Sequence, residues 1–223
     1  RQIDAITFEV TTLAGQSTGG FNDADGTSAL FHHPFSVAPH PTDNYALITD
    51  VFNSRIRKMM LTSPYTVTTV YSSTQNFEPG GPEKIDISPD GNYAVVSGSM
   101  GFGVNIIDLN SDPMEINTFV AGILFPQGLR FFSSGDALLL TEMHSIHHVT
   151  FPGGVVSTFY GSIETLDIAI SSDDQHVYVF DGGRMIHRID VATMQLDYVA
   201  GQSTSGFQDG DATAAKFNMA SGI

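Results

Sequence analysis

Two short segments each carry a pair of aspartates separated by one residue, a spacing that could offer carboxylate oxygens to a calcium ion. The first segment contains Asp23 and Asp25, and the second contains Asp209 and Asp211. An EF-hand loop that began at Asp23 would need a glutamate where this chain has Pro34. The EF-hand motif is therefore excluded. A solvated turn and a calcium site of another kind stay open for both segments.

Both segments also contain a phenylalanine two residues before the first aspartate, Phe21 in one and Phe207 in the other. Aromatic side chains at loop tips supply contact area to a binding partner. We therefore predict that these two segments form a binding surface for a protein or a glycan. The candidate binding residues are Phe21, Asp23, Asp25, Phe207, Asp209 and Asp211.

Histidines are the other candidates for metal chemistry, because three imidazoles can hold a zinc ion. Among the 8 histidines, His33 precedes a predicted strand and His144 follows one, and we single out this pair as candidate zinc ligands. His147 and His148 are adjacent in a predicted strand, where their side chains point to opposite faces and cannot chelate together. An ordinary surface or hydrogen-bonded role for all the histidines is the alternative.

Composition limits the remaining chemistry. The chain has no cysteine, which excludes disulfides, thiolate metal sites and a cysteine nucleophile. No serine-hydrolase elbow, phosphate-binding loop or dinucleotide-binding motif is present, so we identify no catalytic residue. The formal charge of −15 argues against nucleic acid as a partner. No apolar run approaches the roughly 18 residues that a membrane-spanning helix requires, so we predict no insertion into a membrane.

A long internal repeat organises the chain. Residues 13–31 return 186 residues later as residues 199–217, with many Gly, Ser, Thr, Phe, Asp and Ala residues at the same offsets. Weaker copies of the beginning of this repeat occur in between and divide the interval into four units. Each unit holds β-branched and aromatic runs separated by turns rich in Asp, Gly, Asn and Pro, which is typical of β-hairpins.

Four short strands in about 40 to 50 residues are typical of one β-propeller blade. We therefore predict an all-β fold, a single β-propeller domain over residues 1–223. The expected blades span residues 14–71, 72–121, 122–161 and 162–200, and residues 201–223 form a partial blade that closes with residues 4–14. Residues 6–13 are expected to form the outermost strand of that partial blade. On this prediction the chain is an incomplete portion of a five- or six-bladed ring.

The segments Val10–Gly15, Asp25–Thr27 and Thr49–Met59 together resemble the NHL repeat. An NHL blade begins with Leu-Ala-Gly, continues with a glycine-rich Asp-Gly loop, and contains Asp-x-x-Asn-x-Arg-Ile. The first unit matches nearly throughout, and the last partial copy matches as far as it extends. The three units between them keep the strands but lose the Asn-Arg-Ile turn. The resemblance implies four-stranded blades of the NHL type, most often six to a ring.

One polar cluster of the first unit looks functional, but in NHL-like blades it chiefly fixes the turn between the second and third strands. A buried polar group in such a turn requires partners, and this requirement alone accounts for the cluster. The acidic residues at the same position of the third and fourth units are expected to share that role. The cluster is Asp50, Asn53, Arg55 and Arg57, and the two equivalent acidic residues are Glu142 and Asp181.

Two functions remain open. The first is a non-catalytic protein-binding or assembly module, a rigid propeller scaffold that needs no cofactor and belongs to a larger extracellular or cell-surface protein. The acidic, cysteine-free, Ser- and Thr-rich composition suits that location. The alternative is a metal-dependent propeller enzyme, lyase-like or lactonase-like, with a zinc or calcium site on the central channel. A ligand-sensing domain of a larger receptor is a third, lesser possibility.

Overall fold

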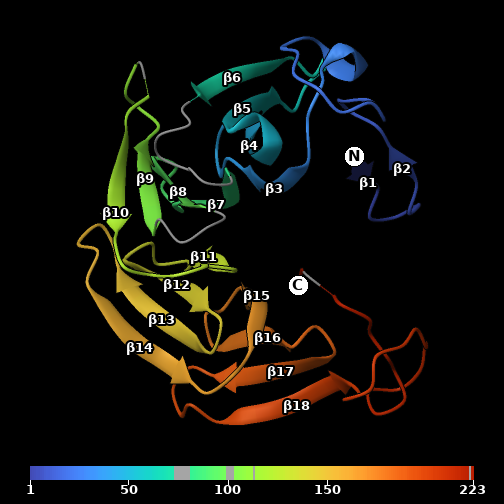
Figure 1. Cartoon of the computed structure of the whole chain (residues 1–223), viewed down its shortest axis with the longest axis vertical. Coiled ribbons are helices and arrows are strands. Elements are labelled where there is room, and N and C mark those ends of the chain that lie inside the picture. Colours follow the sequence, from blue (N-terminus) through green and yellow to red (C-terminus); the bar gives the residue numbers. More distant parts are fainter. Residues whose placement is uncertain (73–80, 99–102, 113, 221) are drawn as a thin grey trace. The chain divides into compact units, whose positions relative to one another are not determined.

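The computed structural model describes residues 1–72, 81–98, 103–112, 114–220 and 222–223 (Figure 1). Four four-stranded antiparallel sheets dominate it, and the strands of each sheet follow one another in sequence order. This is the arrangement of β-propeller blades. The prediction of an all-β propeller fold is confirmed.

Each sheet contains four consecutive strands of the chain. The first sheet contains β3 (Pro34–Pro39), β4 (Tyr45–Asp50), β5 (Arg55–Met60) and β6 (Val67–Ser72). The second contains β7 (Pro82–Ile87), β8 (Tyr93–Gly98), β9 (Val104–Asp108) and β10 (Ile116–Val120). The third contains β11 (Leu129–Phe131), β12 (Ala137–Glu142), β13 (Ser145–Thr150) and β14 (Val156–Gly161). The fourth contains β15 (Thr165–Ile170), β16 (His176–Asp181), β17 (Met185–Asp190) and β18 (Leu196–Gly201).

The chain also divides into two compact parts, each of which contains several of the sequence repeats. We call residues 1–117 unit 1 and residues 118–223 unit 2. In unit 1, β3 lies beside β7, and the facing sides of the two sheets bury aliphatic residues that include Leu47, Ile56 and Ile85. In unit 2, β11 lies beside β15 in the same way, around Leu139 and Ile168. Adjacent first strands with apolar side chains between the sheets are how neighbouring propeller blades pack.

Short polar turns join the first and second strands of the sheets, as their Asp, Asn, Ser and Gly content predicts. In the turn between β7 and β8, the Ser88 hydroxyl and the Asn92 amide donate hydrogen bonds of 2.6 and 3.0 Å to one carboxylate oxygen of Asp90. These bonds hold the pKa of Asp90 below its ordinary value of about 3.8. The ionised carboxylate is therefore part of the folded turn.

We expect the Asp90→Ala variant to lose about 1 kcal/mol of unfolding free energy at pH 7, because the hydrogen bonds to the carboxylate are removed. The loss is small because solvent screens the exposed carboxylate. The contribution of a carboxyl whose pKa is lowered by folding is present above the unfolded value and is lost as the pH falls through the folded pKa. The difference between variant and parent should thus shrink below about pH 3.8. Urea unfolding at pH 7 and pH 3 measures it, and a difference independent of pH would contradict the assignment.

The amino-terminal segment differs from the prediction. Residues 6–13 do not form one continuous strand: only β2 (Val10–Thr11) is a strand, and it pairs with β1 (Gln2–Ile3) in a separate two-stranded sheet. The Asp4 carboxylate accepts hydrogen bonds from the amides of Ile6 and Thr7, so the chain turns there instead of continuing as a strand. This competition between side chain and strand hydrogen bonding is typical of aspartate.

Two short 3-10 helices occur among the described residues, η1 (Gly26–Ser28) and η2 (Val51–Asn53). Within that part of the chain, no helix has the length and apolarity needed to cross a membrane.

Candidate functional site

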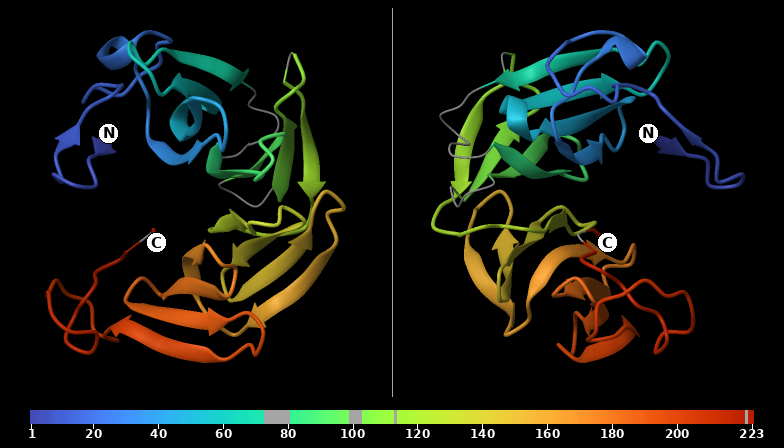
Figure 2. Two further views of the ribbon diagram at one scale, coloured as in Figure 1. Left: turned by 180° about the vertical axis from the view of Figure 1, so that it is seen from behind. Right: turned by 45° about the vertical axis from the view of Figure 1, so that its right-hand side comes forward.

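The sequence repeat is also a structural repeat. We call residues 13–33 the N-loop and residues 199–219 the C-loop. Backbone hydrogen bonds of the N-loop recur in the C-loop at the offset of 186 residues, with nearly the same lengths. The N-loop bonds run from Gly15 N to Gly26 O, Gly20 N to Phe31 O and Leu30 N to Asn22 O; the C-loop bonds run from Gly201 N to Ala212 O, Gly206 N to Phe217 O and Lys216 N to Gln208 O. The two loops, blue and red in Figure 2, therefore share this pattern of backbone hydrogen bonds.

The N-loop encloses the guanidinium of Arg57, which comes from β5 and is fully buried. Its Nε and Nη2 groups donate to Asp23 at 3.1 and 2.6 Å, and Nη2 also donates to the carbonyl of Asn22 at 2.9 Å. Nη1 donates to the carbonyl of Leu30 at 3.0 Å and to the buried carboxylate of Asp50 at 2.7 Å. Two carboxylates and two carbonyls thus satisfy the buried cation, as burial of a charge requires.

Two aromatic rings of the N-loop complete the arginine site. The Arg57 guanidinium carbon lies 5.0 Å from the ring centroids of both Phe21 and Phe31. The guanidinium of Arg55 lies 4.0 Å from the centroid of Phe21. These are distances at which cation–π attraction operates. Phe21, predicted as a loop-tip contact for a partner, therefore packs on arginines of its own blade.

The aspartates of the N-loop also have partners within the chain. Asp23 accepts hydrogen bonds from the Thr69 amide and hydroxyl at 2.9 and 3.1 Å, in addition to those from Arg57. Asp25 accepts a 2.6 Å bond from the Thr66 hydroxyl. Arg57 balances the charge of Asp23, and the partners of Asp23 lie on β5 and β6. These contacts indicate that the aspartates of the N-loop hold the loop onto these two strands.

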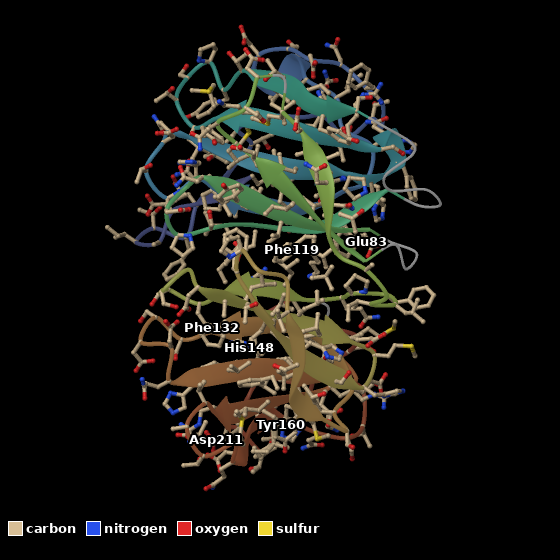
Figure 3. The ribbon with its side chains drawn as sticks, turned by 90° about the vertical axis from the view of Figure 1, so that its left-hand side faces the viewer. Glu83, Phe119, Phe132, His148, Tyr160 and Asp211 are labelled. Carbon is tan, nitrogen blue, oxygen red and sulfur yellow. The ribbon has the colours of Figure 1, made fainter. Side chains whose placement is uncertain are left out.

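The C-loop has the same groups without these partners. Phe207 is 92% exposed, whereas its counterpart Phe21 is 46% exposed. Within the described part of the chain, the carboxylates of Asp209 and Asp211 make no hydrogen bond or ion pair. Figure 3 labels Asp211 on the segment that follows β18. The predicted binding residues of the C-loop are thus exposed, and within the described chain their side chains lack the partners that the N-loop residues have.

A hollow of about 560 Å³ lies against the C-loop. Its lining combines two aromatic rings, a carboxylate, a lysine stem and several small residues. The lining residues are Gly206, Phe207, Gln208, Asp209, Gly210, Ala215, Lys216, Phe217, Asn218 and Ala220. Five of these residues, Phe207, Gln208, Asp209, Lys216 and Phe217, are the counterparts of N-loop residues that contact Arg57.

The polar cluster around Asp50 stabilises the turn between the second and third strands, as predicted. One oxygen of this buried carboxylate accepts a 2.7 Å bond from the His32 amide, and the other accepts bonds from Arg57 and from Asn53 at 2.7 and 2.8 Å. Asn53 also donates to the Gly20 carbonyl at 2.9 Å, which ties the N-loop to the turn. The carboxylate therefore joins the N-loop, the turn and the third strand.

Sequence reasoning missed the partners that replace Arg57 in the other blades. Arg57 is paired with Ile48, two residues before Asp50. In the third blade the same position is held by His147, which is paired with Leu140, two residues before Glu142. His147 contacts Glu142 at 3.0 Å. The equivalence of Arg57 and His147 becomes visible only when the strands are paired, because it depends on the register between the second and third strands. The corresponding residues of the second and fourth blades are Asn105 and His187, and His187 lies 3.4 Å from Asp181.

The two candidate zinc ligands lie in different units and stay a prediction. His33 is exposed in unit 1 and stacks on Phe52, with ring centroids 4.8 Å apart. Burial raises the pKa of nearby Glu83, and His33 and Lys84 partly oppose this shift. His144 is exposed in unit 2. Among the described residues, no three His, Cys, Asp or Glu side chains gather as a metal site.

The blades and their packing define the class: the chain is a β-propeller protein. No protein-family model and no curated protein matches its sequence. An auxiliary nutrient binding protein from Bacteroides thetaiotaomicron is similar in structure, with a TM-score of 0.75 and 15% identity over 94% of this chain and 53% of that chain. This chain therefore spans about half the length of that protein.

Two further structures share the fold. A chain of the nidogen–laminin complex has a TM-score of 0.66 and 15% identity over 75% of this chain and 65% of that chain. A 6-phosphogluconolactonase candidate from Bacteroides uniformis has a TM-score of 0.55 and 13% identity over 74% of this chain and 53% of that chain. At these identities the similarity establishes the fold alone.

Proposed function

We propose that this chain is a protein-binding module that uses the C-loop as its contact surface. One observation carries the proposal: Phe207, Asp209 and Asp211 are exposed and unpartnered in the described structure, while the same residues of the N-loop are engaged. Phenylalanine and other aromatic residues are enriched at protein–protein interfaces relative to the rest of the surface. The blades behind it provide a rigid support.

Charge and fold shape the rest of the proposal. The formal charge of −15 favours a partner that is basic where it meets the C-loop. We assign the blades to the NHL type on the Asp50, Asn53 and Arg57 contacts, and the location to the extracellular side or cell surface on composition. The partner is then a protein of a larger extracellular assembly. Among the similar structures, the nidogen–laminin complex is one in which a propeller chain occurs with a protein partner.

Photo-crosslinking tests the proposal. A benzoylphenylalanine at position 207 is expected to give a heavier adduct when the protein is irradiated in an extract of its native source. The same probe at Phe125, a phenylalanine of unit 2 that is 48% exposed, is the matched control and should give at least about tenfold less of that adduct.

Excess unlabelled parent protein should suppress the adduct, and excess Phe207→Ala protein should not. Equal adducts at positions 207 and 125, or none at 207, would show that the C-loop is not a contact surface. An adduct of twice the chain mass would indicate self-association and would also contradict a heterologous partner.

A further inference from the structure

We infer that unit 2 contains a small-molecule site, a hollow between the third and fourth blades that takes a ligand with an aromatic ring and a positively charged amine. The hollow measures about 500 Å³, within the range of about 300–1,000 Å³ that is typical of small-molecule sites. Its described lining lies entirely between positions 132 and 194, so the C-loop contributes nothing to it. The site is therefore independent of the proposed function.

The corresponding place between the first two blades shows what fills the same space. Turn hydrogen bonds establish the correspondence: the His40 amide donates to the Tyr45 carbonyl, and the Phe132 amide donates to the Ala137 carbonyl. Tyr45 is 5% exposed and belongs to the core shared by the first two sheets. Ala137 stands at the same place in the core of unit 2. The hollow thus follows from the residue type at this position, where the third blade carries a methyl group in place of a phenol ring.

The groups that surround the Tyr45 ring have counterparts at the hollow. The centroid of this ring lies 4.7 Å from that of His40 and 3.9 Å from the Lys58 ammonium. In the third blade, Phe132 stands at the position of His40. His148 stands at the position of Lys58 in the register between the second and third strands. Phe132 and His148 both line the hollow, with ring centroids 6.2 Å apart, so a ligand ring placed there meets aromatic side chains (Figure 3).

The hollow has room for more than one ring. An apolar cavity of about 150 Å³ is enough to bind benzene. At about 500 Å³, this hollow also accommodates a short substituent on the ring. Phe159 and Val191 add apolar surface to its wall, and both pack against the core of unit 2. The shape therefore favours an aromatic ring that carries a side chain.

The charged groups of the hollow select the substituent. Asp136 and Asp174 supply two carboxylates, and the described lining contains no lysine or arginine. Asp136 accepts a 2.5 Å bond from the Ser134 hydroxyl, and Asp174 accepts bonds of 3.1 and 3.0 Å from the Ser133 amide. These bonds orient the carboxylates and leave each of them further acceptor capacity. An ammonium group on the ligand is attracted to this hollow, and a carboxylate is repelled.

The first test titrates the complete chain with tyramine, a phenol ring that carries an ammonium group at neutral pH. Isothermal titration calorimetry is expected to give a Kd below about 1 mM. 4-Hydroxyphenylacetate has the same ring and the opposite charge, and should bind at least about tenfold more weakly. Equal affinities for the two compounds, or no saturation by tyramine up to about 10 mM, would overturn the inference.

The second test fills the hollow. Ala137→Tyr introduces the ring that the first blade has, and should weaken tyramine binding at least about tenfold. Ala5→Tyr, the same change at an exposed alanine of unit 1, is the control and should leave the Kd unchanged. Asp136→Asn leaves the core unaltered and should weaken binding about fivefold, with Asp112→Asn in unit 1 as its control. A parent-like Kd for Asp136→Asn, or for folded Ala137→Tyr protein, overturns the site.

The C-loop provides a further control. Phe207→Ala should leave the tyramine Kd unchanged, because the hollow and the C-loop share no lining residue. Loss of tyramine binding in this variant would place the ligand at the C-loop and overturn the inference. A position-207 adduct without tyramine binding counts against the hollow alone, and tyramine binding without that adduct counts against the C-loop alone.

Discussion

Replacing Arg57 with alanine is expected to destabilise unit 1 by about 3–5 kcal/mol. The variant would leave the fully buried carboxylate of Asp50 without its cation, and would detach the N-loop from β5. Since the chain has two compact units, the readout should be local. Amide hydrogen exchange in β4 and β5 measures the free energy of opening of unit 1 alone.

Arg55→Ala is the matched control for this prediction. Arg55 is half-buried, lies over the Phe21 ring and donates one 2.6 Å bond to the Asn53 carbonyl, so its loss should cost about 1 kcal/mol. Substituting Asp50 by asparagine in the Arg57→Ala background should recover part of the loss, because the uncompensated charge is then removed. Equal costs for the two arginines would contradict a specific role for Arg57.

Gly201→Ala is expected to cost about 2–5 kcal/mol in unit 2. Gly201, the last residue of β18, has a φ of +105°, where a side chain is strained. An added Cβ would collide with the carbonyl oxygen of Arg184, the residue before β17. Gly15, its counterpart, has a φ of +88°, but an added Cβ there would meet only the Phe31 ring, at 3.1 Å.

Gly15→Ala is therefore the control and should cost about 1–2 kcal/mol, since the ring can move where backbone cannot. Hydrogen exchange in β17 and β18 for the first variant, and in β5 and β6 for the second, gives the two values. A smaller cost at Gly201 than at Gly15 would mean that the backbone contact of Gly201 relaxes without penalty.

The blades could be predicted because their information is local. Alternating apolar runs and turn residues define each strand, and the weaker copies that divide the 186-residue interval into four units define the period. The end-of-strand carboxylates Asp50, Glu142 and Asp181 were also accessible, since they stand at the same place in each repeat. The structure places each of them opposite the first residue of the third strand.

The occupant of each loop could not be predicted in this way. Phe21 and Phe207 have the same sequence surroundings, yet arginines of β5 cover one, and no described residue covers the other. Tertiary packing of a distant strand decides the difference. The amino-terminal turn failed for a local reason, because the Asp4 carboxylate captures amides that a strand would have used.

The most direct test of the account is amide hydrogen exchange of the complete chain with and without its crosslinked partner. New protection is expected in residues 202–220, and unchanged exchange is expected in residues 13–33, because Arg57 already fills the N-loop. Protection confined to other segments, with the C-loop exchanging as fast as in the free protein, would contradict it.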